Sequence, residues 1–287
     1  MRQLETIRRI DKAFRTGAIV FPGVRVKGMK QMQNILLGVA FVISTVFAVL
    51  ALYMISRKLL WRYADDGTDA LAGSMIFRIS ALHGLILALV FAQELQQYGE
   101  LRLALTEEAS AVADIWNDLA RYDGPTRHEI QSTLTSYVNE VAGPEWTRLG
   151  EGQGLSAKAW KDWETVYEGV LALEPTSVRE EALRNHMLDN ARRIARLRDQ
   201  RETESIYSLT PIFWLAAVAG VIFVVIPYFT FAPTVLHLSL LGIYAAYVGL
   251  IIHLIYAFTN PYEQPARLPP AAFERLLATE IGVQHRS

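Results

Sequence analysis

The chain has 287 residues, of which 52% are hydrophobic and 20% are charged, and its formal net charge is −1. Soluble domains usually carry about 25% charged residues, so this composition favours a membrane protein, and the near-neutral charge gives no reason to expect nucleic-acid binding. The absence of cysteine excludes disulfides, thiolate metal sites and thiol nucleophiles.

Residues 1–31 form a basic arm, with eight Lys or Arg against Glu5 and Asp11. One interpretation is a surface helix lying on an anionic inner leaflet, and the other is a disordered tail that sets topology. The apolar face of such a helix would hold Ile7, Ile10, Phe14 and Ala18. The apolar stretch that follows is too long for a signal-peptide core, so we expect a retained anchor.

Four apolar stretches are long enough to cross the membrane as helices, which takes about 20 residues. They are residues 32–56, 75–95, 211–231 and 235–258. Only Ala232-Pro233-Thr234 separates the last two, so we expect an antiparallel hairpin. The spans therefore fall in two pairs, within 32–95 and within 210–259.

The distribution of Lys and Arg predicts the orientation. The basic arm precedes the first span, and five arginines lie on the approach to the third (Arg192, Arg193, Arg196, Arg198 and Arg201), whereas the Pro233 turn carries no charge. We therefore expect a multi-pass protein of the inner (plasma) membrane, with both termini and the segment 96–209 in the cytoplasm.

Segment 96–209 reads as a helical domain inserted between the second and third spans. Leu101, Leu105, Ala109, Val112, Trp116 and Leu119 follow the spacing of an amphipathic helix. No helix breaker precedes them, so one helix of about 70 Å is expected from near Met75 to Arg121.

Three more helices are expected in this domain. The first covers 126–141 and is stopped by Gly143-Pro144, the second covers 157–171, and the third covers 176–207. Thr176 or Ser177 can cap the third, with Glu180 completing a capping box. Trp146, Trp160 and Trp163 are assigned to the domain core, and 260–287 to a cytoplasmic tail.

Residues 70–114 carry a recognisable pattern. It comprises small residues before and within the second span, an apolar run, an aromatic-acid pair and Glu-Ala at the start of a long helix. The matching residues are Gly73, Gly84, Leu87-Ala88-Leu89-Val90-Phe91, Tyr98, Glu100, Glu108 and Ala109. The pattern resembles the core of a bacterial membrane family with a bestrophin-like domain. Pro261 and the later Phe-x-x-Leu-Leu resemble that family's C-terminal part, although Asn260 replaces the more usual acidic residue.

This resemblance implies an all-α membrane protein related to oligomeric anion channels. Such channels have four membrane helices per subunit, a pore lined by the second and a cytoplasmic helical vestibule. The partners implied are the lipid bilayer, other copies of the chain and small anions such as chloride. The residues do not set the number of subunits.

The second span has a candidate pore face. On a helix, six side chains fall within an arc of about 80°: Arg78, Leu82, Leu85, Leu89, Gln93 and Gln96. In a pore, Arg78 would attract anions at the outer mouth and the leucines would form a constriction that gates by dewetting. Alternatively, Arg78 reaches the lipid headgroups and the leucines face lipid.

His83 is an ionisable residue inside the second span and thus a candidate proton-sensitive gate. The alternative is a neutral histidine hydrogen-bonded to a neighbouring helix. Small residues at short helical spacing allow two helices to pack closely in lipid. They are Gly84, Ala88 and Ala92 in the second span and Gly242, Ala246 and Gly249 in the fourth.

We find no sequence motif of an enzyme, no metal site and no cofactor-binding motif. His237 and His253 lie at opposite ends of the fourth span and cannot share a metal ion. The leading hypothesis is a homo-oligomeric channel for small anions. The alternative is a non-conducting membrane scaffold or sensor that recruits a partner through its cytoplasmic helices.

Overall fold

The computed structural model describes residues 22–63, 67–122, 124–206 and 211–281, and every regular element in these ranges is helical. Four of the helices are long and apolar enough to cross a membrane. Both findings confirm the predicted fold class at this level. The part of the basic arm before Pro22, with its possible surface helix, lies outside the described residues.

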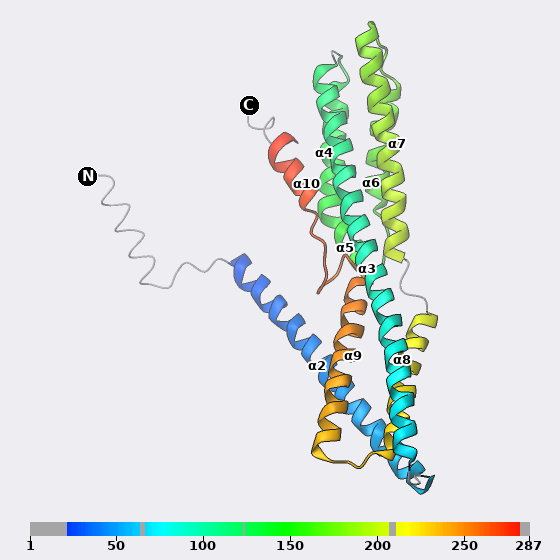
Figure 1. Ribbon diagram of the computed structural model, residues 1–287. Helices are drawn as coiled ribbons and strands as arrows, with labels where there is room; N and C mark the ends of the chain where they lie inside the picture. Colours follow the sequence, from blue (N-terminus) through cyan, green and yellow to red (C-terminus); the bar gives the residue numbers. More distant parts are fainter. Residues whose placement is uncertain (1–21, 64–66, 123, 207–210, 282–287) are drawn as a thin grey trace, which may run out of the picture.

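The four apolar segments lie side by side in one half of the molecule (Figure 1). They are α2 (Pro22–Leu60), α3 (Thr68–Arg121), α8 (Pro211–Val225) with the 3₁₀ turn η3 (Ile226–Thr230), and α9 (Val235–Phe258). The first helix begins ten residues before its apolar stretch, with Pro22 at its first position, where the missing N–H costs no helical hydrogen bond. A further 3₁₀ turn, η1 (Trp61–Tyr63), follows α2.

The hairpin between the last two spans has the expected turn. Thr234 caps α9, since its hydroxyl accepts a hydrogen bond from the backbone N–H of His237 at 3.2 Å. Arg57 at the end of α2 donates hydrogen bonds to the backbone oxygens of Phe229 and Phe231, at 3.0 and 2.5 Å. These bonds fix the end of the first span to the hairpin turn.

Helix α3 is continuous over 54 residues. At 1.5 Å per residue it is about 80 Å long, and it runs from the end of the spans that holds η1 and the hairpin turn into the second half of the molecule (Figure 1). The uninterrupted helix predicted for this region is therefore present, and it starts seven residues before Met75.

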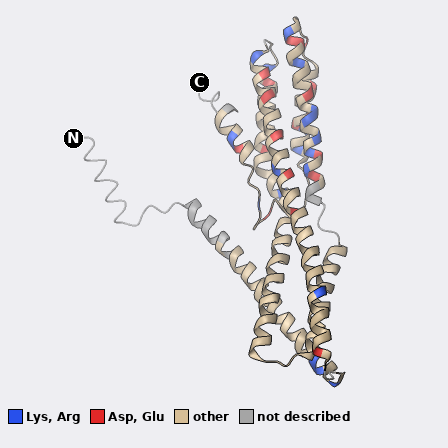
Figure 2. Cartoon of the chain, in the orientation of Figure 1, with Lys and Arg blue, Asp and Glu red and all other residues tan. Residues whose placement is uncertain are grey.

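The domain that follows, here called the insert, packs against the far half of α3. Its elements are α4 (Arg127–Glu140), the π-helical turn η2 (Val141–Glu145), α5 (Trp146–Gly150), α6 (Ala157–Leu171) and α7 (Val178–Ile206). Lys, Arg, Asp and Glu are concentrated over it, whereas the spans are nearly free of charge (Figure 2).

Two local predictions for the insert have different outcomes. The N-terminus of α7 is capped as expected: Ser177 Oγ accepts from the N–H of Glu180 at 3.2 Å, and Thr176 donates to Glu180 at 2.6 Å. The expected stop at Gly143-Pro144 is wrong, because the chain stays helical there. In the wider π turn, the missing N–H of Pro144 does not interrupt an α-helical ladder.

The segment after α9 is part of the core of the insert. Tyr262, Leu268, Phe273 and Leu276 are at most 5% exposed and pack with Trp146 and the apolar stripe of α3. The last two of them belong to α10 (Ala271–Leu276), which leads into the π turn η4 (Leu277–Ile281). The chain thus returns from the fourth span and completes the core that α3 began.

Candidate functional site

The exposed face of α3 within the spans carries the residues of the candidate pore face. The side chains of Leu82, Leu85 and Leu89 are 59, 57 and 63% exposed in the single chain. Arg78, Gln93 and Gln96 are exposed on the same face. The structure therefore brings all six together in one stripe that no described part of the chain covers.

The two ends of this stripe differ in chemistry. Arg78 lies toward the end of the molecule that holds the hairpin turn and η1, and Gln96 lies toward the insert. The amide of Gln96 donates to Glu100 at 2.8 Å, so the polar stripe continues along the same helix beyond the span.

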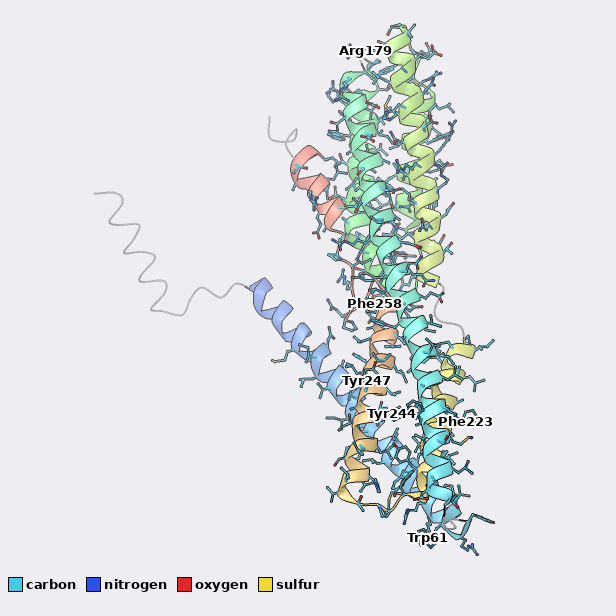
Figure 3. The ribbon with its side chains drawn as sticks, viewed as in Figure 1. Trp61, Arg179, Phe223, Tyr244, Tyr247 and Phe258 are labelled. Carbon is cyan, nitrogen blue, oxygen red and sulfur yellow. The ribbon has the colours of Figure 1, made fainter. Side chains whose placement is uncertain are left out.

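A groove of about 540 Å³ lies between α3 and α9, beside this stripe. Gly84 and Ala88 line it on one side and Tyr244 and Tyr247 on the other. Both tyrosines lie at mid-height of α9 (Figure 3). No described atom outside its own helix lies within 4 Å of a Cβ built on Gly84, and Ala92 is exposed. Within the described chain, no helix packs onto these small residues.

The small residues of α9 face α2. A Cβ on Gly249 would lie 2.9 Å from Cβ of Thr45, and one on Gly242 would lie 4.0 Å from Val46. Ala246, between them, is partly buried. This strip lets the first and fourth spans approach closely.

His83 lies on the side of α3 opposite the exposed stripe and is 3% exposed. Its Nδ1 is 3.2 Å from the hydroxyl of Tyr244, and its Nε2 is 3.1 Å from the backbone oxygen of Ala217. Both ring nitrogens are therefore engaged with the neighbouring spans α9 and α8. This geometry corresponds to the alternative in which His83 is hydrogen-bonded to neighbouring helices. It also keeps the ring away from the candidate pore face.

A buried ionic cluster in the insert was missed by the sequence reasoning. Glu145 bonds Arg198 through two hydrogen bonds, of 2.9 and 3.2 Å, and Arg201 through one of 2.7 Å. Arg201 also reaches Glu108 of α3 at 3.3 Å, and Tyr137 donates to Glu108 at 2.5 Å. All five side chains are at most 1% exposed.

The two carboxylates of this cluster stabilise the charged form of the buried arginine Arg201. Burial alone would lower the pKa of Arg201, but Glu108 and Glu145 outweigh it and raise that pKa. Burial also raises the pKa of Tyr137, as does the adjacent Glu108, so the phenol stays a neutral hydrogen-bond donor. Two arginines and two carboxylates are formally neutral together, so each buried charge has a partner of opposite sign that offsets part of its desolvation cost. At Glu108 burial still outweighs the two arginines and raises the pKa of the carboxyl.

The sequence does contain a signal for this cluster. Glu108 lies three residues after Leu105 and four before Val112, inside the apolar stripe of α3. Arg198 and Arg201 likewise continue a buried row on α7. The preceding members of that row are Met187, Ala191 and Ile194. Two of the five arginines read as topogenic charges are thus core residues of the insert.

Two other expectations concern aromatic residues and metals. Trp146 is 1% exposed and donates to the backbone oxygen of Leu268 at 2.9 Å, and Trp160 and Trp163 form an edge-on pair with ring centroids 5.4 Å apart. Among the described residues, no group of three or more His, Asp or Glu could hold a metal ion.

Comparisons with known proteins agree with this architecture. The family model of the bestrophin-like domain matches residues 42–273. A mutant of a bacterial bestrophin homolog from Klebsiella pneumoniae, known from its crystal structure, has a similar fold, with a TM-score of 0.56 and 11% sequence identity. The likeness covers 84% of this chain and 98% of that one. No curated protein sequence matches the chain significantly.

Proposed function

Since the chain belongs to the bestrophin-like domain family, we propose that it forms a homo-oligomeric ion channel whose pore is lined by α3. In this proposal small anions such as chloride pass between copies of the exposed stripe. The observation that carries it is the stripe itself, where Leu82, Leu85 and Leu89 are all more than half exposed in the single chain.

The chemistry along the stripe supports the passage of anions. Arg78 places a permanent positive charge at one mouth, which raises the local concentration of anions. The three leucines form an apolar constriction in which water, and therefore an ion, is unstable until the pore widens. Gln93 and Gln96 offer amide groups to an ion that leaves toward the insert.

We further propose that the insert and the C-terminal segment face the cytoplasm of the cell, with the protein in the inner membrane. The distribution of Lys and Arg supports this orientation, because eight of them lie in residues 1–31 and five arginines precede the third span, whereas the Ala232-Pro233-Thr234 turn has none. Arg78 is then at the outer mouth.

Anion flux through the full-length protein in liposomes tests the proposal. The purified oligomer is reconstituted into chloride-loaded liposomes, and chloride efflux is followed while a potassium ionophore clamps the voltage. We expect efflux that depends on the protein. If the oligomers pass no ions at any pH or voltage, the channel hypothesis is wrong. The alternative, a non-conducting membrane scaffold, would then be favoured.

The Arg78→Ala variant tests which residues line the pore. Its reversal potential in a chloride gradient should shift toward lower anion preference, because the charge at the mouth is lost. Arg62→Ala is the matched control, since Arg62 is exposed at the same end of the spans but belongs to η1. If the reversal potential is the same in both variants and in the wild type, Arg78 does not lie at the mouth of the pore.

A further inference from the structure

Two adjoining cavities lie where the first half of α2 diverges from the end of α9 (Figure 1). Each has a volume of about 330 Å³, and both are lined by Asn34, Glu263 and Gln264. The amide of Asn34 donates to Gln264 at 3.4 Å and so bridges α2 and the segment after α9. The two cavities thus meet at this bridge.

The cavity on the side of the insert contains charges of both signs. Glu151 and Glu263 supply two carboxylates, and Arg267 supplies a guanidinium. All three side chains are exposed, and none of them forms an ion pair within 4.0 Å in the described part of the chain. A ligand with a cationic and an anionic group close together would complement these charges.

The cavity on the side of the spans is partly apolar. Leu37 of α2 and Tyr256 and Ala257 in the last turn of α9 form its walls. Helix α9 ends at Phe258, close to the insert (Figure 3), so the cavities lie at the level where the apolar spans end. Ile35 and Leu36 of α2, 60 and 62% exposed, continue the apolar surface outside the cavity.

We propose that this junction binds a membrane phospholipid with a zwitterionic headgroup that carries a primary amine, as in phosphatidylethanolamine. Arg267 binds the phosphate group, because a guanidinium donates two parallel hydrogen bonds to phosphate oxygens. Glu151 and Glu263 accept hydrogen bonds from the ammonium group. The acyl chains follow the exposed aliphatic side chains of α2.

The chemistry of the site predicts its selectivity among lipids. The quaternary ammonium of a choline headgroup has no N–H to donate to the two glutamates. A glycerol headgroup has no positive charge, so the carboxylates oppose its net negative charge. Of these three headgroups, only ethanolamine satisfies both halves of the site.

Native mass spectrometry of the full-length protein in detergent tests this proposal without any measurement of ion flux. The lipid-binding proposal can therefore fail independently of the proposed channel function. Phosphatidylethanolamine, phosphatidylcholine and phosphatidylglycerol with identical acyl chains are added at equal concentration. We expect the ethanolamine lipid to be retained about tenfold more than the others, the value of one charge-assisted hydrogen bond of roughly 1.4 kcal/mol.

Three variants locate the site. Arg267→Gln should lower retention of the ethanolamine lipid about tenfold, and the double variant Glu151→Gln/Glu263→Gln should abolish its advantage over the choline lipid. Arg179→Gln, at the far tip of α7 (Figure 3), should leave retention unchanged. Equal retention of all three lipids, or the same lipid preference in every variant, would overturn the proposal.

Discussion

Gly220 of α8 lies against the imidazole ring of His83, so closely that a Cβ at position 220 would come within 2.2 Å of Cδ2 of the ring. The histidine can reach the backbone oxygen of Ala217 only because position 220 has no side chain. The orientation of this intramembrane histidine is therefore decided by a glycine on a different span.

Replacing this glycine should disrupt the packing of the spans. Gly220→Ala forces a methyl group into the ring of His83, and overpacking of this kind costs about 1–3 kcal/mol. We expect a lower unfolding temperature of the purified protein in detergent. Gly99→Ala is the control, because no described atom outside its own helix lies within 4 Å of its Cβ. A Gly220→Ala protein as stable as Gly99→Ala would contradict this account.

Breaking the buried ionic cluster should destabilise the insert strongly. Glu145→Gln removes the negative charge that holds Arg198 and Arg201 and leaves two buried guanidinium groups with less compensation. Loss of one partner of a buried ion pair costs about 3–5 kcal/mol. Chemical denaturation, followed by the fluorescence of the tryptophans in the insert, measures this loss.

The matched control for that experiment is on the surface of the same domain. Glu107 pairs with Arg193 at 2.9 Å, and both side chains are about half exposed. Glu107→Gln should therefore change the free energy of unfolding by no more than about 1 kcal/mol. Equal losses for the two variants would show that burial does not govern the contribution of the cluster.

The stability of the insert should fall as the pH rises above neutrality. Nδ1 of His186 donates to Asp118 at 2.5 Å, and this hydrogen bond raises the pKa of His186 above its ordinary value. Since the folded state binds the proton more tightly, the stabilisation is complete below about pH 6.5, the unfolded pKa. It is lost as the pH passes upward through the folded pKa.

Comparing unfolding free energies from about pH 6 to about pH 9 tests this dependence. His186→Gln should flatten the curve, whereas His128→Gln should leave it unchanged, because His128 is exposed on α4. If the wild-type curve shows no downward slope in this range, or His186→Gln retains it, the ion pair does not contribute.

The proposed channel should conduct more when its constriction is made polar. Leu85 is 57% exposed in the single chain, so Leu85→Ser removes little packing within the subunit. A hydroxyl in the proposed apolar constriction stabilises water there, and we expect about a tenfold increase in chloride flux, equivalent to about 1.4 kcal/mol. The measurement is efflux from liposomes. The control is Phe223→Ser, because Phe223 is exposed on α8 and not on the stripe of α3. This variant should leave chloride flux unchanged.

Much of the architecture could be predicted from the sequence, because the forces that determine it are local. About 20 consecutive apolar residues specify a span, and the absence of a breaker after Met75 specifies the long helix α3. The caps at Ser177 and Thr234 are also set within a few residues. That the six residues of the stripe share one face of α3 follows from helical periodicity alone.

The tertiary structure decided which partners these elements find. Glu108 and Arg201 are 93 residues apart, and Trp146 and Leu268 are 122 residues apart. No local pattern specifies such pairs, because they depend on how α3, α7 and the segment after α9 pack into one core. The sequence identified His83 as an unusual residue, but only the positions of Ala217, Gly220 and Tyr244 set its orientation.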